Sequence, residues 1–91
     1  MILISYDISD DKLRSKFSKY LLKFGHRIQY SVIEIDNSRR ILENIEQEIK
    51  NNFENRFQQT DSVLIFDMTD SCKITRMGYA KNEEKDIVIV K

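Results

Sequence analysis

Apolar residues recur along the chain with two different periods, and each period predicts one kind of element. Residues 2–7 are rich in β-branched and aromatic side chains and are predicted to form a strand. The next segment has apolar residues every three to four positions, which predicts an amphipathic helix capped by Ser9 or Asp10. Gly25 is expected to end this helix in the left-handed conformation. The apolar positions of the helix are Leu13, Phe17, Leu21 and Phe24.

The middle of the chain predicts a further β region and a second helix. Residues 26–36 are β-rich but change their alternation, which indicates one bent strand or two short strands that turn near Tyr30 and Ser31. The second helix is predicted to begin after the capping residues Asn37 and Ser38. Its apolar face contains Ile41 or Leu42, Ile45, Ile49 and Phe53.

The last third of the chain predicts three more strands and one turn. Residues 61–68 are the most continuous apolar run, which is typical of a central strand. Residues 72–79 alternate as an edge strand would, 80–85 form a polar turn, and 86–90 form a last strand. The order of elements predicts an α+β protein with a ferredoxin-like βαββαβ fold and an extra C-terminal strand, in a single domain covering residues 1–91.

In this fold the helices cover one face of the sheet, so the composition of the other face matters. The predicted strands are apolar on both faces, because Ile2 and Leu3 are adjacent and residues 63–66 are unbroken. A solvated sheet face would alternate more cleanly. We therefore expect a homodimer that packs sheet to sheet, with the last strand adding to the partner's sheet.

Composition narrows the class of protein further. The chain has 91 residues, 41% of them hydrophobic, and 15 basic residues balance 15 acidic ones, so bulk charge favours no partner. Cys72 is the single cysteine and cannot form an internal disulfide, which fits a reducing cytoplasm. No signal peptide or membrane-spanning run is evident, so no membrane partner is expected.

Sequence signatures of the common enzyme classes are absent. There is no glycine-rich phosphate loop, paired-histidine motif or nucleophile elbow, and His26, the single histidine, is more typical of a solvated surface. The basic-glycine-aromatic signature of RNA-recognition modules is also missing. Asp10 and Asp11 are mainly explained as acids that favour a helix start.

Asp7 is the best candidate for chemistry, with two interpretations open. A carboxylate at a strand end, brought beside its counterpart across a two-fold axis, would suit Mg²⁺, which keeps most of its waters and needs few protein ligands. Alternatively, Asp7 is an ordinary strand-end acid that faces the amide groups of the next helix.

Basic residues are candidates for binding nucleic acid. Arg39 and Arg40 open a helix, where a cation is unfavourable for the dipole, so they suggest a compensating ligand such as phosphate. A set of solvated charges is the alternative interpretation. The candidates are Arg14, Lys16, Arg27, Arg39, Arg40, Lys73 and Arg76.

Longer segments resemble one known family. The segments "YDISDDKLRSKFSKYLLKFGHRIQYSVIEI", "DSVLIFDMTDSCKITRMG" and "DIVIV" resemble the small CRISPR-associated adaptation protein, the nuclease-fold partner of the spacer integrase. The likeness spans essentially the whole chain. Two positions depart from the family pattern: Lys16 stands where some members have a second arginine, and Ile33 replaces the usual phenylalanine.

The resemblance implies a ferredoxin-like homodimer in which the Asp7 carboxylates of two subunits face each other and share Mg²⁺ or Mn²⁺. By matching position, the other residues that it implies for cleavage are Tyr6, Arg14, Arg27 and Ser31. It further implies a role in spacer acquisition. The dimer would hold prespacer double-stranded DNA and bridge integrase dimers, with a metal-dependent endonuclease activity on RNA or DNA as a secondary property. An RNA-cleaving toxin (mRNA interferase) of the same fold is the alternative.

Overall fold

The helices and strands follow one another in the predicted order, and the two helices lie on one face of a single sheet. The computed structural model describes residues 1–69, 72–78 and 89–90. The elements are β1 (Ile2–Asp7), α1 (Asp11–Leu21), β2 (Gly25–Gln29), β3 (Val32–Ile35), α2 (Arg39–Glu48), β4 (Ser62–Asp67), β5 (Cys72–Gly78) and β6 (Ile89–Val90). The helical chain continues beyond α2 as a π-helical segment, η1 (Ile49–Phe53), and a 3-10 turn, η2 (Glu54–Arg56). No helix in these described ranges is both long and apolar enough to cross a membrane.

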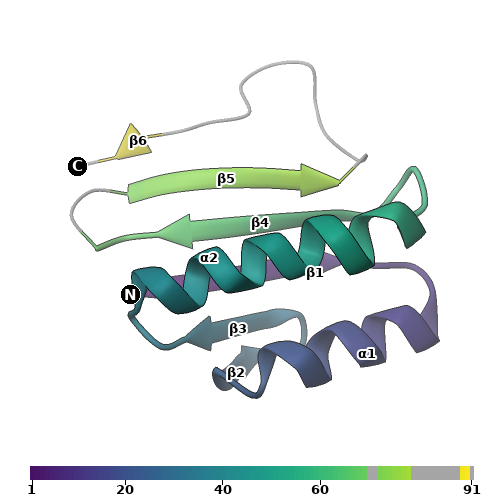
Figure 1. Ribbon diagram of the computed structural model, residues 1–91, viewed down its shortest axis with the longest axis horizontal. Coiled ribbons are helices and arrows are strands. Elements are labelled where there is room, and N and C mark those ends of the chain that lie inside the picture. Colours follow the sequence, from purple (N-terminus) through teal and green to yellow (C-terminus); the bar gives the residue numbers. More distant parts are fainter. Residues whose placement is uncertain (70–71, 79–88, 91) are drawn as a thin grey trace.

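The sheet is antiparallel, and its described strands follow the order β2-β3-β1-β4-β5-β6 (Figure 1). The two central strands are β1 and β4, which pair from Ile2↔Asp67 to Asp7↔Ser62. The apolar run 61–68 is therefore central, as predicted. The arrangement confirms an α+β, ferredoxin-like fold.

The hydrophobic core lies between the sheet and the two helices. Alternate residues of β1 are buried on this side, and an aromatic cluster fills the space beneath α1. The Phe17 ring is fully buried and packs edge-on against Tyr6 at 5.2 Å and Phe53 at 5.1 Å between centroids. Such pairs add to the burial energy of each ring, so Phe17 joins α1, β1 and η1.

Side-chain caps fix the starts of both helices as predicted. The Asp10 carboxylate accepts a hydrogen bond of 2.8 Å from the Leu13 amide, and the Ser38 hydroxyl accepts one of 3.3 Å from the Ile41 amide. Each cap satisfies an amide group that the first helical turn leaves without a backbone partner.

The predicted role of Gly25 is wrong. Helix α1 ends at Leu21, and Gly25 is the first residue of β2 rather than a left-handed helix stop. Within residues 1–69, 72–78 and 89–90, Gly78 alone has a positive φ, at +104°. Gly25 is required for a different reason, because a β-carbon there would lie 1.9 Å from the Glu34 carbonyl oxygen of the neighbouring strand.

The β-rich run 26–36 forms two strands that turn at Tyr30 and Ser31. Its irregularity is a register shift between Arg27 and Gln29 in β2, whereas the alternation of the sequence changes at Val32 and Ile33 and favoured a bulge or turn there. The Tyr6 amide donates to the Ser31 carbonyl at 3.1 Å, which extends the β1–β3 pairing to the turn.

Strand β6 pairs with β5 of the same chain at only two positions, Cys72↔Val90 and Lys73↔Ile89. The predicted edge strand 72–79 thus has a second neighbour at its beginning. The predicted polar turn at 80–85 lies outside the described residues.

Candidate functional site

Asp7 lies on the sheet face opposite the helices, which we call the open face. It is exposed and follows buried Tyr6 in β1, so the two neighbouring side chains point to opposite sides of the sheet. No residue in the described part of the chain forms a hydrogen bond or ion pair with its carboxylate. The amides at the start of α1 are capped by Asp10 instead. This geometry argues against Asp7 as an acid that faces that helix.

The open face is more apolar than a solvated surface. Residues of β1, β3, β4 and β5 that alternate with the core positions are half-buried in the single chain. The apolar ones are Leu3, Val32, Leu64, Phe66 and Ile74, and we call them the open-face patch. Arg76 pairs with Leu64 in register and so shares this face with Asp7.

A single chain offers little to a metal ion. Among the described residues, no three His, Cys, Asp or Glu side chains gather into a group that could hold one. An exposed Asp7 without a described partner is nevertheless the donor type that Mg²⁺ prefers. The residues fit the predicted metal only where two copies each supply one carboxylate.

Tyr6, Arg14 and Arg27 lie together in a second place, a pocket of about 420 Å³ between α1 and the β2–β3 turn. We call it the arginine pocket. It is also lined by Asp11, Ser15, Ser18 and Tyr30. Ser31 adjoins it through the backbone, because its carbonyl accepts from the Tyr6 amide. The predicted cleavage residues are therefore divided between the open face and this pocket.

Hydrogen bonds hold both guanidinium groups of the arginine pocket in place. Arg27 Nη1 donates to Tyr6 Oη at 3.2 Å and to the Tyr30 carbonyl oxygen at 2.6 Å. Arg14 Nη1 donates to the Ile8 carbonyl oxygen at 2.9 Å, and its Nη2 forms an ion pair with Asp11.

The Asp11 hydrogen bond raises the pKa of Arg14 above its ordinary value, and the Tyr30 phenol adds to this electrostatically. Arg14 therefore stays a cation at every relevant pH.

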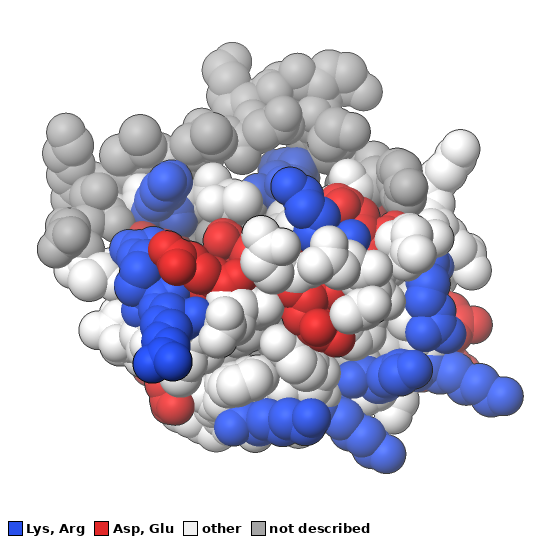
Figure 2. Space-filling view, in the orientation of Figure 1, with Lys and Arg blue, Asp and Glu red and all other residues white. Residues whose placement is uncertain are grey.

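The remaining basic candidates do not join this pocket. Arg39 Nη2 lies 3.1 Å from Asp67 Oδ2, so Asp67 offsets the dipole cost that had suggested a phosphate. Lys73 lies opposite Asp67 in the backbone register of β4 and β5. Arg40 is exposed on α2, and Lys16 lines a different recess beside Glu48 and Phe53. Figure 2 shows basic side chains along α1 and at the start of α2, with acidic side chains between them.

Asp67 is nearly buried and is held as a carboxylate. Burial acts to raise the pKa of the Asp67 carboxyl, but hydrogen bonds from Thr69 and the Arg39 cation outweigh burial and lower the pKa. The Thr69 hydroxyl donates to Asp67 Oδ1 at 2.8 Å. Arg39 and Asp67 thus form a structural contact at the end of the sheet farthest from Asp7 along β1.

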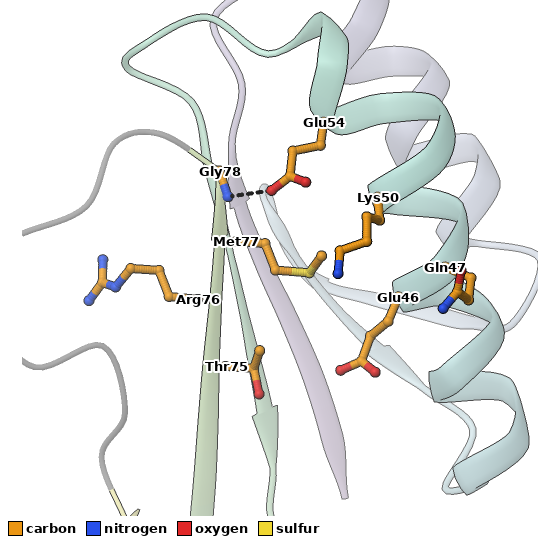
Figure 3. Close-up of a pocket in the computed structure, with 8 residues that line it drawn as sticks. All are labelled: Glu46, Gln47, Lys50, Glu54, Thr75, Arg76, Met77 and Gly78. Atoms are coloured by element: carbon orange, nitrogen blue, oxygen red, sulfur yellow. Dashed lines mark hydrogen bonds between the residues drawn. The ribbon is translucent and has the colours of Figure 1, made fainter.

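A larger cavity of about 480 Å³ lies between β5 and the helical segment α2–η2 (Figure 3). Partial burial is the main cause that raises the pKa of Glu46 there. Glu54 Oε2 accepts from the Gly78 amide at 3.3 Å. Arg76 is one of the lining residues, but its side chain points away from the cavity (Figure 3). None of the basic candidates therefore directs its side chain at an anion there.

Two residues near the site were not predicted. Asp61 is fully buried; its Oδ1 accepts from the Ser9 amide at 2.9 Å and the Ser9 hydroxyl at 3.0 Å, while Oδ2 accepts from the Gln58 amide at 2.8 Å. It ties the loop after Asp7 to the turn before β4. Tyr30, which is 75% exposed, forms one wall of the arginine pocket. An exposed aromatic in a polar turn was the available signal for Tyr30, whereas Asp61 resembles any turn residue.

The fold and these two sites define a small ferredoxin-like protein with an open sheet face, a strand-end carboxylate and a pocket with two arginines. The sequence profile of the family described as CRISPR associated protein Cas2 matches residues 1–76, a span that contains every predicted site residue. The chain therefore belongs to this family.

Individual relatives agree with that assignment. The chain is 32% identical over 90 residues to CRISPR-associated endoribonuclease Cas2 2 of Methanospirillum hungatei, with 97% of each chain covered. It is 31% identical over 85 residues to CRISPR-associated endoribonuclease Cas2 4 of Rhodospirillum rubrum, covering 93% of this chain and 66% of that one.

A solved structure shares the fold. It is a hypothetical protein from Thermus thermophilus, which is 27% identical with a TM-score of 0.64 and is matched over 77% of this chain and 82% of its own.

Proposed function

We propose that this protein is a CRISPR adaptation protein of the cytoplasm that works as a homodimer and cleaves nucleic acid with the help of a divalent metal. The observation that carries the proposal is Asp7, an exposed carboxylate beside the open-face patch in a chain of the Cas2 family. The curated relatives bear the name endoribonuclease, which supports phosphodiester cleavage as the reaction. Family membership is also the reason to prefer this role over that of a toxin of the same fold.

The open-face patch supports the dimer. Half-buried apolar side chains on one sheet face lose unfavourable contact with water when a second copy covers them, at roughly 25 cal/mol for each Å². A two-fold pairing through this face would place Asp7 of one protomer and Asp7 of its partner in the same interface.

In that arrangement the two Asp7 carboxylates would hold Mg²⁺ or Mn²⁺. When bound, such an ion activates water and neutralises charge on a phosphate. Arg14 and Arg27 bind phosphate oxygens of the same strand, because guanidinium groups match phosphate geometry and both are fixed by backbone carbonyls. Tyr6 orients Arg27 through its hydroxyl oxygen.

The same dimer would also serve as a scaffold that holds DNA and integrase. Basic side chains along α1 and α2 of both copies would contact the backbone of prespacer double-stranded DNA, and the dimer would bridge two integrase dimers (Figure 2). Because such contacts release counterions, DNA binding should weaken steeply as salt rises.

Asp7→Ala tests the proposal, with Asp36→Ala as a control that removes an exposed carboxylate elsewhere. Cleavage of labelled RNA and duplex DNA is measured with Mg²⁺ and with a chelator, together with the solution mass and duplex binding. Asp7→Ala should reduce cleavage by about 100-fold or more and leave the dimer and DNA binding intact. Cleavage that survives both Asp7→Ala and chelation would refute the metal mechanism, and a monomeric mass would refute the shared site.

A further inference from the structure

The arginine pocket has the features of a site for one nucleotide, and it lies on the helix-covered side of the sheet, away from Asp7. Its walls come from α1, β1 and the β2–β3 turn. Its volume of about 420 Å³ falls in the range of small-molecule sites, about 300–1,000 Å³. Three observations indicate which ligand the pocket would bind.

The first observation concerns the Tyr6 hydroxyl. Tyr6 is only 4% exposed, and its oxygen accepts from Arg27 Nη1 at 3.2 Å, so the hydroxyl proton must point elsewhere. No acceptor for that proton exists among the described residues, although Tyr6 lines the pocket. Because Tyr6 lines the pocket, its hydroxyl proton can be donated to a ligand there. An anionic oxygen in the pocket would accept its hydrogen bond.

The second observation is the balance of charge in the pocket. Arg14 and Arg27 contribute two cations, and Asp11 is the one carboxylate among the lining residues. Carbonyl oxygens of Ile8 and Tyr30 hold the two guanidinium groups, so little side-chain freedom remains to be lost on binding. The pocket thus has a net positive charge and preorganised donors, which suit a phosphate group.

The third observation is the Tyr30 ring. It is 75% exposed and stands in the turn that Arg27 fixes through the Tyr30 carbonyl. Exposed aromatic rings beside cations are the usual platform for unpaired bases, because every base has a π-face that can stack. A base inside a duplex is already stacked on its neighbours and has no such need.

We propose that the arginine pocket binds one unpaired nucleotide, with its phosphate on Arg14, Arg27 and the Tyr6 hydroxyl and its base stacked on Tyr30. This inference rests on the proposed nucleic-acid function and assigns a preference within it. The protein holds a single-stranded end or loop in the pocket while a paired region contacts only its backbone. Tyr30 is a binding residue, and it sets the preference for unpaired over paired substrate.

The test uses a blunt DNA duplex and the same duplex with a single-stranded overhang that carries 2-aminopurine. A matching RNA overhang forms a second arm. Affinity is measured by fluorescence anisotropy, and stacking by quenching of the 2-aminopurine. The overhang should bind more tightly than the blunt duplex and its fluorescence should fall. Tyr30→Ala should weaken overhang binding by about 10-fold and remove the quenching, while Tyr30→Phe, which keeps the ring, should preserve both.

A matched pair of charge variants checks the phosphate contact. Arg14→Ala should reduce the preference for the overhang, whereas Lys12→Ala removes an exposed cation from the same turn of α1 and should not change it. Equal affinity for blunt and overhanging DNA, with no quenching, would overturn the nucleotide pocket and leave the proposed function standing. Failure to bind any of these nucleic acids would overturn both.

Discussion

The two faces of the sheet are made from the same strands but differ in what they contain. In β1 and β4, one set of alternate residues is buried beneath the helices, and the other set is half-buried on the open face. The covered face is complete in a single chain, because its aromatic rings contact one another. The open face lacks such a cover among the described residues. The comparison teaches that the covered face specifies the fold, and that the open face is the one left for the proposed association.

Polar groups differ between the faces in the same way. On the covered side, Asp61 and Asp67 are buried and satisfied by hydrogen bonds from Ser9, Gln58 and Thr69. On the open side, Asp7 has no partner in the described part of the chain. The two buried acids thus stabilise the fold, whereas the Asp7 carboxylate stays available for the proposed metal.

The largest effect is expected from a change in the covered core. Phe17→Ala removes a fully buried ring that three other aromatic rings contact, and it should lower the free energy of unfolding by about 3–5 kcal/mol. Urea denaturation measures this loss. Leu22→Ala, at a position 37% exposed, should change stability far less. Similar losses for both variants would contradict the assignment of the core to this face.

A charge on the open face should break the association without unfolding the chain. Leu64→Glu places a carboxylate in the open-face patch and should weaken dimerisation by about 100-fold, or about 2.7 kcal/mol. Sedimentation measures the dimer, and circular dichroism checks the fold. Gln47→Glu adds the same charge to an exposed position on α2 and serves as the control. An unchanged dimer would show that this face is not the interface.

Asp61 is buried on the covered side, and its carboxylate accepts hydrogen bonds from Ser9 in the loop that follows Asp7. Asp61→Asn replaces one acceptor oxygen with a donor that faces amide groups, which should cost about 1–3 kcal/mol of unfolding free energy. Cleavage should also fall, since Ser9 would no longer be held. Full stability combined with wild-type cleavage would refute a positioning role for this carboxylate.

The smallest effect is expected for the Arg39–Asp67 pair. Hydrogen bonds from Thr69 and the Arg39 cation lower the folded-state pKa of Asp67, so the charged carboxylate stabilises the fold above the ordinary aspartate pKa of about 3.9. This contribution is lost as the pH falls through the folded value. Arg39→Ala should therefore cost about 1 kcal/mol at neutral pH and progressively less in acid. Thermal melts across this range test it; a deficit that does not depend on pH would argue against an ionic origin.

Local rules predicted the elements well because each signal is contained in a short stretch of sequence. The caps Asp10 and Ser38 and the position of Asp7 at a strand end follow from spacing alone. The role of Gly25 could not be predicted, since its close neighbour Glu34 belongs to another strand. Asp67 as the partner of Arg39 likewise required the tertiary structure.

The candidate site was predicted as a set of residues but not as two places. Strand alternation alone places Tyr6 and Asp7 on opposite faces of β1, as the structure confirms, but it does not show that Tyr6 shares a pocket with Arg14 and Arg27. Tyr30 was assigned only to a turn, because the contribution of that turn to a pocket depends on how it packs beside α1.

The pleat of β1 also limits which changes in its sequence the protein can tolerate. A one-residue shift in the pairing register of β1 would exchange the two sides of the strand, so that the Asp7 carboxylate would face the Phe17 ring and the Tyr6 phenol would point to the open face. The core and the proposed site would then be lost together. The spacing of this first strand should consequently tolerate substitution far better than any change in length.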